Sequence, residues 1–454
     1  MIRPGEWNSA VSRHSLSILA CVALFAVASC GGVGNNNEPA QGKSQVTTMG
    51  FGLPDEHATA RVDAVKAANP NIEIKINEGA FDEQQFLSAV ASNQPPDAVY
   101  LDRNKLGSFV ARGAIEPMDD CLSREKVNLD DYREQAVKQV QYQGKTYGLP
   151  EFNAVRVLII NNVAVREAGL QPSDVSTTDW AALPALTDKL VKLDGGKLAR
   201  IGFDPKVPDF LPMWAKANDA ELVTPDGTPT LHDPKVIEAV QATVDLVNRQ
   251  GGWAQFKAFR DSWDFFGAKN QYVSNQLAAM PMENFYINTL AANSPDADVT
   301  FAPFTDRNGE PLSYASGQAW AIPKGSKNRD AACKFIVGMT KTDTWVTAAK
   351  ARRDALTKQN KPYSGTFTAN KKADEQIFAE VYNAKDNKII NDGVEVAKSV
   401  QDVAYSLPAN PAGNELVTAY TGAINRVLNG QQSVDDAMSQ AQREAQDAIE
   451  AAKK

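Results

Sequence analysis

Few side chains in this sequence combine a reactive type with the spacing that catalysis or metal binding requires. His57 and His232 are the only histidines after the N-terminal apolar run, and they lack the spacing of metal ligands. The motifs of a nucleophile elbow, a zinc protease and a phosphate-binding loop are absent from the sequence. Carboxylates such as Asp102, Glu151 and Glu283 could form a glycosidase pair if they converged. Since most acids are solvated surface charges, we expect no catalytic site and no metal site.

A short glycine-rich stretch, GFGLPD (residues 50–55), precedes a helical pattern as a dinucleotide-binding loop would. Asp55 replaces the third glycine and would place a negative charge against a pyrophosphate. A tight turn between a strand and a helix, which needs small residues, explains the stretch better. The sequence therefore predicts no cofactor.

Aromatic residues are more informative candidates for a binding site. Phe and Tyr cluster in the stretches FRDSWDFF and ENFY. The tryptophans beyond the N-terminal region are Trp180, Trp214, Trp253, Trp263, Trp320 and Trp345. Aromatic faces can stack on the apolar faces of sugar rings, but most tryptophans are packed in cores. Composition alone leaves both interpretations open.

The N-terminal region resembles an export signal. Its apolar run, from about Ser15 to Ser29, is shorter than the roughly 20 residues of a membrane-spanning helix. Basic residues precede the run and small residues end it, as in a signal peptide. Val27-Ala28-Ser29-Cys30 resembles the lipobox of bacterial lipoproteins, in which the cysteine is acylated and becomes the first mature residue. An ordinary signal peptide that is cut nearby is the alternative.

We therefore expect residues 1–29 to be removed and Cys30 to anchor the protein to the cell membrane, outside the cytoplasm. Residues 30–44 are rich in Gly and Asn and predict a flexible tether. In an oxidising compartment Cys121 and Cys333 could form a disulfide bond, or they could be separate buried thiols.

The charge balance excludes one class of partner. The sequence holds 55 Asp and Glu against 47 Lys and Arg, and it has no basic block. Binding to a phosphate backbone needs clustered cations, so we expect no nucleic-acid partner.

The elements that must position these residues follow an α/β pattern. Residues 45–51 predict a strand, and a helix that opens at Pro54 should end before Asn69-Pro70. Ile72, Ile74 and Ile76 alternate with polar residues, as in a half-buried strand, and PDAVYLD (96–102) predicts a third strand after another helix. This alternation favours a mainly parallel sheet flanked by helices.

The pattern recurs later in the chain. VRVLIINN (155–162), QLAAMPMENF (276–285) and GQAWAIPKG (317–325) predict strands, and a helix is expected to begin at Asp179. Pro234 opens another helix, and Ser433 caps an amphipathic C-terminal helix. The length fits two α/β lobes.

Several motifs occur in an order that resembles one family, the extracytoplasmic sugar-binding proteins of ABC importers of the maltodextrin-binding type. They cover nearly the whole chain after the signal. The stretches are AANPNIEIKI, QPPDAVYLDRNKLGSFVARGAIEPMDD, YQGKTYGLPEFNAVRVLIINNVAVREAGL, STTDWAALPALTDKL, NQLAAMPMENF and GQAWAIPKGSKNRDAACKFI.

The resemblance implies two α/β lobes of the periplasmic-binding-protein type, which close on a ligand about a hinge. It implies lobe 1 at residues 45–153 with a return at 317–360, lobe 2 at 154–316, and a hinge return with C-terminal helices, mainly in lobe 2, at 361–454. The protein would be a monomer that binds a carbohydrate, delivers it to the permease subunits of an importer and catalyses no reaction.

The resemblance also implies ligand-binding residues. Asp102, Asn104 and Lys105 follow the PDAVYL strand, where the family has hydroxyl-binding side chains, although Lys105 could equally be a solvated amine. Asn153 and Arg156 lie where the chain crosses between lobes, and the acid that the family often has there is missing.

Other candidates follow later strands. They are Trp214, Glu283, Asn284, Phe285, Gly317 and Gln318. Trp214 stands where the family commonly has a helix tryptophan near the ligand, so stacking on the ligand is expected. Phe285 could stack where the family has a tryptophan.

Alternatives remain open. Arg156 and Lys105, in place of a cleft acid, would also suit glycerol-3-phosphate or a glycerophosphodiester. A secreted lipoprotein that cleaves glycans and a surface adhesin that reuses the fold are the alternatives from other classes.

Overall fold

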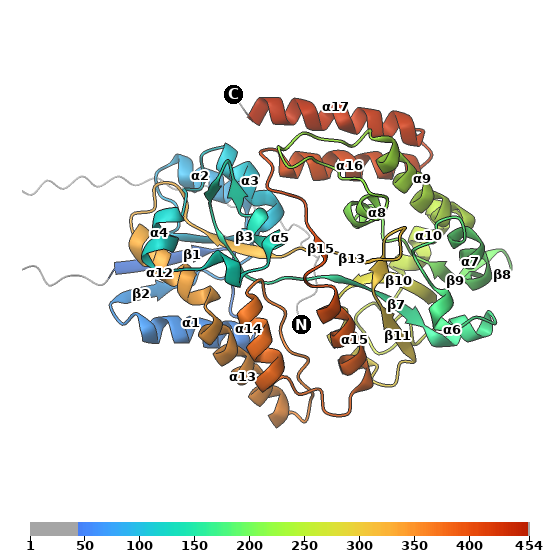
Figure 1. The fold of residues 1–454 in the computed structure, drawn as a ribbon, viewed down its shortest axis with the longest axis horizontal. Helices are drawn as coiled ribbons and strands as arrows, with labels where there is room; N and C mark the ends of the chain where they lie inside the picture. Colours follow the sequence, from blue (N-terminus) through green and yellow to red (C-terminus); the bar gives the residue numbers. More distant parts are fainter. Residues whose placement is uncertain (1–43, 453–454) are drawn as a thin grey trace, which may run out of the picture. The chain divides into compact units, whose positions relative to one another are not determined.

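The computed structural model describes residues 44–452, so the signal segment, Cys30 and the tether lie outside the described residues. Two five-stranded sheets, each covered by helices, organise this part of the chain (Figure 1). We call the elements around the first sheet lobe 1 and those around the second sheet lobe 2.

Lobe 1 is built on the sheet β2-β1-β3-β14-β6. Its strands are β1 (Ser44–Met49), β2 (Ile72–Lys75), β3 (Ala98–Asp102), β6 (Leu149–Pro150) and β14 (Gln318–Ala321). Its helices are α1 (Glu56–Ala68), α2 (Glu83–Ala91), α3 (Arg103–Ala111), α4 (Asp119–Arg124), α5 (Glu134–Lys138), α12 (Arg329–Thr340), α13 (Thr342–Lys358) and α14 (Lys371–Gln376). A short hairpin, β4 (Gln141–Tyr142) and β5 (Lys145–Thr146), is a separate pair.

Lobe 2 is built on the sheet β11-β7-β10-β9-β8. Its strands are β7 (Arg156–Asn161), β8 (Lys192–Asp194), β9 (Lys197–Phe203), β10 (Leu277–Glu283) and β11 (Val299–Ala302), and β12 (Phe304–Thr305), β13 (Pro311–Tyr314) and β15 (Ala404–Tyr405) form a small third sheet. Its helices are α6 (Asn162–Glu167), α7 (Leu183–Leu190), α8 (Leu211–Ala217), α9 (Pro234–Arg249), α10 (Gly252–Asp261), α11 (Tyr286–Asn293), α15 (Lys388–Ser399), α16 (Gly413–Leu428) and α17 (Val434–Ala452).

The sheets are mixed, which corrects the expectation of mainly parallel sheets. β1 runs parallel to both β2 and β3, but β14 is antiparallel to β3 and β6. In the five-stranded sheet of lobe 2 only β9 and β10 pair in parallel, while β7 is antiparallel to both of its neighbours. β7 and β14 each begin directly after a crossing between lobes. Each of them therefore enters its sheet from the side of the hinge. A strand that runs parallel to the preceding one is instead reached through a connecting helix.

The chain crosses between the lobes around residues 151–155, 315–317 and 382–387. An isolated antiparallel bridge joins Ala154 to Ser316, so the first two crossings lie side by side. The segment after α13 stays with lobe 1, because Thr368 bridges to Phe152 and α14 packs against α13.

Local sequence explains most element boundaries. Asp55 caps α1 by accepting from the Ala58 N–H at 3.0 Å, and Ser433 Oγ accepts from the Asp436 N–H at 3.1 Å at the start of α17. Gly50 has a φ of +86°, and a Cβ there would meet the Tyr100 carbonyl oxygen at 2.2 Å. The GFGLPD stretch is therefore a tight turn that needs glycine.

One expected helix begins later than its sequence predicts. α7 starts at Leu183, not at Asp179, because the Asp179 carboxylate accepts from the N–H groups of Ala181 and Ala182 and closes a separate turn. Pro184 then occupies the first turn of the helix, where it is tolerated.

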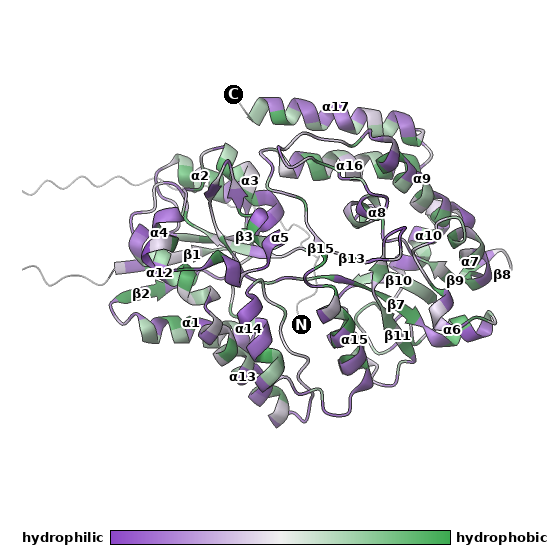
Figure 2. Cartoon of the chain, in the orientation of Figure 1, coloured by the Kyte–Doolittle hydropathy of each residue, from purple (hydrophilic) through white to green (hydrophobic). Residues whose placement is uncertain are grey.

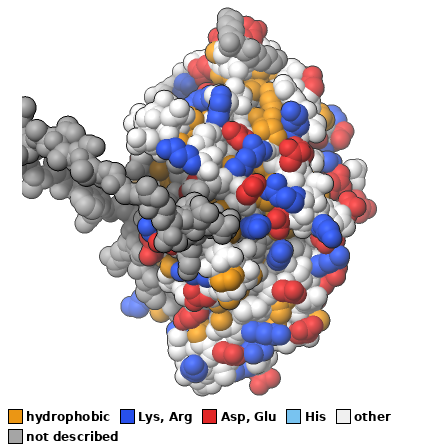
Figure 3. Space-filling view, turned by 90° about the vertical axis from the view of Figure 1, so that its left-hand side faces the viewer, with side chains coloured by type: hydrophobic (Ala, Val, Ile, Leu, Met, Phe, Trp, Pro, Cys, Tyr) orange, Lys and Arg blue, Asp and Glu red, His pale blue; other side chains and the backbone are white. Residues whose placement is uncertain are grey.

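Strands such as β7 and β10 are mostly apolar, and helices such as α17 alternate polar and apolar residues along their length (Figure 2). On the face in Figure 3, acidic and basic side chains are interspersed. Within residues 44–452 no helix has the length and hydropathy of a membrane span.

The two remaining cysteines meet. Cys121 on α4 and Cys333 on α12 form a disulfide bond, with their Cα atoms 5.8 Å apart. The bond ties the return segment of lobe 1 to its first part, which resolves the alternative that the sequence left open.

Candidate functional site

A cavity of about 750 Å³ lies at the crossings and has walls from both lobes. Lobe 1 contributes the start of α1, the end of α13 and residues 360–367, and lobe 2 contributes residues 284–295 and α15. The first crossing, residues 152–154, forms another part of the wall. A molecule in this cavity would contact both lobes and the segment that joins them.

His57 lies in the lobe 1 wall and is held by aromatic rings. Its imidazole centre lies 6.2 Å from the Phe152 ring and 5.3 Å from the Trp345 ring, and the side chain is buried. Burial, with the nearby Arg61 charge, lowers the pKa of His57 to about 3. The ring is therefore neutral at physiological pH. Its Nε2 lies 3.4 Å from Thr366 Oγ1, so it offers a neutral hydrogen-bonding edge.

Two buried asparagines lie where strands or crossings reach the cavity. Asn284 follows β10, and its Oδ1 accepts from the Val155 N–H at 3.1 Å. Asn153 lies on the first crossing, and its Nδ2 donates to Gln401 Oε1 at 2.8 Å. Both amides are thus fixed by the chain around them, and Asn153, whose Oδ1 also accepts from Arg103 at 3.0 Å, is fully buried.

Phe285 supplies an accessible aromatic surface. It directly precedes α11, lines the cavity and remains 45 % exposed, unlike most aromatic residues of this chain. An exposed ring in a cavity wall is suited to stacking on an apolar ligand face.

Arg156 lies beside the cavity wall, and its charge is already compensated. Nη1 donates to the Ala154 carbonyl at 3.1 Å, the Tyr314 carbonyl at 2.9 Å and Ser316 Oγ at 2.8 Å. Nη2 lies 3.5 Å from Glu283 Oε1. This arginine therefore ties the first crossing to the second, and Glu283 serves as its counter-ion.

Asp102 and Gln318 form a separate polar pair at the end of β3. Gln318 Nε2 donates to Asp102 Oδ1 at 3.1 Å, and Tyr100 OH lies 3.5 Å from Gln318 Oε1. Gly317 is fixed by close packing, because a Cβ there would meet the Phe152 carbonyl oxygen at 2.1 Å. These residues adjoin the crossing without lining the cavity.

Asn104 and Lys105 line a different hollow, of about 590 Å³, between lobe 1 and the C-terminal helices. Glu83, Asn414 and Glu415 are among the other residues there. Asn104 and Lys105, which follow the PDAVYL strand, therefore line a different hollow from Asn284 and Phe285, which follow β10.

Trp214 does not contact a ligand site, which corrects the expectation that it stacks on the ligand. It is fully buried in the lobe 2 core, against Trp180, Phe203 and Phe304, and its Nε1 donates to the Pro205 carbonyl at 2.8 Å. Every surface of the indole is occupied by protein, so it is a packing residue.

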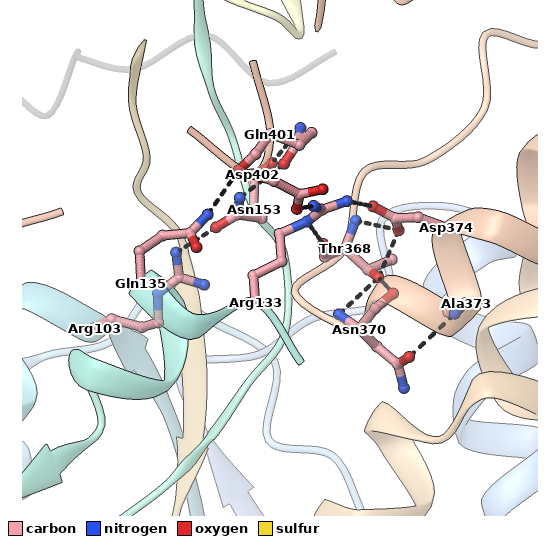
Figure 4. A network of polar contacts seen from close by, with 10 residues as sticks. All are labelled: Arg103, Arg133, Gln135, Asn153, Thr368, Asn370, Ala373, Asp374, Gln401 and Asp402. Atoms are coloured by element: carbon pink, nitrogen blue, oxygen red, sulfur yellow. Dashed lines mark hydrogen bonds and ion pairs between the residues drawn. The ribbon is translucent and has the colours of Figure 1, made fainter. Parts of the chain in front are cut away.

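A polar network beside the cavity holds the crossings together (Figure 4). Arg103 donates to the Phe152 carbonyl at 2.6 Å and to Asn153 Oδ1 at 3.0 Å. Arg133 pairs with Asp374 at 2.7 Å and also with Asp402. Gln135 Nε2 donates to the Gln401 carbonyl at 2.8 Å. The network joins lobe 1 to the turn between α15 and β15.

Sequence reasoning missed His57, Thr366 and the rest of the 360–367 segment. A lone buried histidine and a loop without a motif give no signal in one sequence. Only the fold brings that loop against the first crossing. Among the described residues, no group of three or more His, Cys, Asp and Glu is placed to hold a metal ion.

Comparisons with known proteins agree with this architecture. The sequence profile of the family "bacterial extracellular solute-binding protein" matches residues 54–353. The arabinooligosaccharide-binding protein of Bacillus subtilis (strain 168) is 22 % identical over 332 residues, which are 70 % of this chain and 74 % of that protein.

Two solved structures show the same fold. CpMnBP1 with mannotriose bound has 25 % identity and a TM-score of 0.70, over 88 % of this chain and 100 % of that one. The maltose/maltodextrin-binding domain MalE from Bdellovibrio bacteriovorus, bound to maltotriose, has 18 % identity and a TM-score of 0.63, over 90 % of this chain and 99 % of that one.

Proposed function

This chain belongs to the bacterial extracellular solute-binding protein family, and from that premise we propose that it captures a carbohydrate between its lobes and delivers it to an ABC importer. The observation that carries the proposal is the cavity with walls from both lobes and from the first crossing. Contacts from both lobes are complete only when the lobes are closed, so a ligand shifts the population toward the closed form.

The chemistry of the wall supports a neutral sugar. Asn284, Thr366 and neutral His57 offer donors and acceptors to hydroxyl groups, and Phe285 offers a ring face. The same class of ligand is supported by a relative that is named an arabinooligosaccharide-binding protein and by the structure of CpMnBP1 with mannotriose bound.

A phosphorylated ligand is less well supported. Arg156, which motivated that alternative, donates from Nη1 to three protein oxygens and pairs with Glu283. Arg352 lines the cavity but pairs with Glu56 at 2.5 Å. A phosphate would have to compete with these partners.

We further propose that the moving units are residues 45–153 with 317–381, and 154–316 with 388–452. Asp102, Gly317 and Gln318, which adjoin the first crossing, would approach the ligand from lobe 1 when the lobes close, whereas Asn104 and Lys105 face the separate hollow by the C-terminal helices. The family description supports a place outside the cytoplasm. We propose that the protein is a monomer, that a lipid on Cys30 anchors it to the cell membrane, and that it catalyses no reaction.

A thermal-shift panel tests this function. Neutral mono-, di- and trisaccharides are compared with aminosugars and glycerol phosphates, on the chain from residue 44. A ligand at about 100 times its Kd adds roughly 2.7 kcal/mol of stability. We expect one neutral sugar series to raise Tm. A response to phosphorylated compounds alone would favour the phosphate alternative, and silence across the panel would contradict sugar capture.

Phe285→Ala tests the stacking surface within that panel. Because Phe285 is 45 % exposed, its truncation should change the unfolding free energy little. The loss of stacking should weaken sugar binding by about tenfold, measured by calorimetry. Phe266→Ala, at a residue that is 60 % exposed and does not line the cavity, is the matched control and should bind sugar normally.

A further inference from the structure

The cavity wall is chemically divided. The lobe 1 side and the first crossing contribute Asp55, His57, Asn153, Arg352 and Thr366. Helices α11 and α15 instead contribute mainly aliphatic residues, namely Ile287, Ala291, Ala292, Ile390 and Val394, with Pro295 just after α11. We call this second set the aliphatic wall. Asn284, Asn288 and Asn387 are the polar residues that lobe 2 adds beside it.

The aliphatic wall is a packed surface. Ile287, Ile390 and Val394 are each at most 2 % exposed, because α11 packs against α15. A Cβ at Gly393 would meet Ile287 at 2.8 Å, so the two helices are in close contact there. Ala292 and Pro295 extend the wall as exposed small residues. Leu356 of α13 adds an apolar side chain from lobe 1.

A bare sugar does not match this wall. Hydroxyl groups placed against the accessible carbon of Ala292, Pro295 and Leu356 would find no donors or acceptors there, and a buried hydroxyl without a partner is costly. The aliphatic wall also lacks the ring faces on which sugars stack, which lie instead at Phe152 and Phe285. A cavity of about 750 Å³ is in the usual range for sites that enclose a ligand of drug size.

We propose that the ligand is a saccharide that carries an apolar substituent, such as an alkyl or acyl group. The saccharide occupies the side of His57, Asn153 and Thr366, and the substituent lies against the aliphatic wall. This inference rests on the proposed function and specifies its substrate class. The gain would come from apolar surface that the substituent buries against Ala292, Pro295 and Leu356.

Matched pairs of probes test the inference. The saccharide that responds in the thermal-shift panel is compared with its own octyl glycoside, below the critical micelle concentration, by calorimetry. We expect the octyl glycoside to bind at least tenfold more tightly. Equal affinity would overturn the inference while the capture of a sugar stood.

Variants separate a ligand-binding wall from a surface that the lobes bury on closing. Ala292→Asn and Leu356→Asn place amides on the wall, and both should reduce the ratio between the two affinities toward one. Thr289→Asn, on the same helix but outside the cavity lining, is the control and should keep the ratio. If the two wall variants weakened both probes by the same factor, the wall would be a closure surface and the inference would be wrong.

The failure of the proposed function has a different signature. In that case no free saccharide of the panel and no octyl glycoside would bind, and both proposals would be wrong. Binding of an octyl oligoethylene glycol ether as tight as that of the octyl glycoside would also overturn the inference, because the sugar would then contribute nothing.

Discussion

At the scale of single residues, His57 makes the stability of the protein depend on pH. Its pKa is about 3 in the folded protein and about 6.5 in an unfolded chain. Between these values the unfolded chain binds a proton that the folded protein does not, so stability falls as pH falls below 6.5. From pH 7.5 to 5.5 this one group should lower the unfolding free energy by about 1.4 kcal/mol.

Urea denaturation of the wild type and of His57→Gln at both pH values measures this effect. The difference in unfolding free energy between wild type and His57→Gln should change by about 1.4 kcal/mol from pH 7.5 to 5.5, because the two proteins share all other titrating groups. A difference that stays constant would mean that the pKa of His57 is the same in the folded protein as in the unfolded chain. Sugar affinity should not vary over this range on account of His57.

The family resemblance, rather than any local pattern, implies part of the site at this scale. Asn284 and Phe285 follow β10, Asn153 follows the short strand β6, and all three line the cavity. Trp214, which the resemblance places near the ligand, instead turns its indole into the core of lobe 2. The sequence does not determine which way an aromatic residue points on a helix such as α8, whose residues are buried on nearly every side.

At the scale of elements, the disulfide bond fastens α12 to α4 across 212 residues of sequence. Closing so long a loop restricts the unfolded chain, and removing such a bond typically costs about 2–5 kcal/mol. The double variant Cys121→Ser/Cys333→Ser should therefore lose stability of this order. Chemical denaturation with and without a thiol reductant checks it.

The same double variant supplies the control for the reductant. Reduction should destabilise the wild type and leave the variant unchanged. Because neither cysteine lines the cavity, sugar affinity should be kept in the variant. Equal stability of the oxidised and reduced wild type would show that the bond does not form.

The order of strands and helices is largely visible in the sequence, but the direction of the strands is not. Alternating Ile72, Ile74 and Ile76 and the apolar run of β7 predict strands that the structure contains. The antiparallel direction of β7 and β14 follows from the crossings between lobes, which no local pattern reveals. The start of α7 likewise depends on the turn that Asp179 closes.

At the scale of the whole molecule, the polar network couples the crossings to the cavity. Asn153 lines the cavity and donates to Gln401, whose carbonyl accepts from Gln135 of lobe 1. Asn153→Ala and Gln401→Ala should each weaken sugar binding, the second without touching the ligand. The double variant should lose less than the sum, because both single changes remove the same hydrogen bond.

A double-mutant cycle on Kd measures that coupling. Glu415→Ala, in the hollow by the C-terminal helices, is the comparison variant, and it should combine additively with Asn153→Ala. Additive losses for Asn153 and Gln401 would show that the network supports the fold without positioning Asn153.

Closure of the lobes is the property that separates a binding protein from an enzyme built on the same fold. A ligand that contacts both lobes stabilises the form in which all contacts are made, so a saturating sugar should lower the radius of gyration in X-ray scattering. A sugar that gives no thermal shift should leave the radius unchanged. The bound oligosaccharide should be recovered at its full length after long incubation, because no step of capture breaks a glycosidic bond. A shortened oligosaccharide, absent from a Glu283→Gln sample, would instead reveal a catalytic carboxylate beside the crossings.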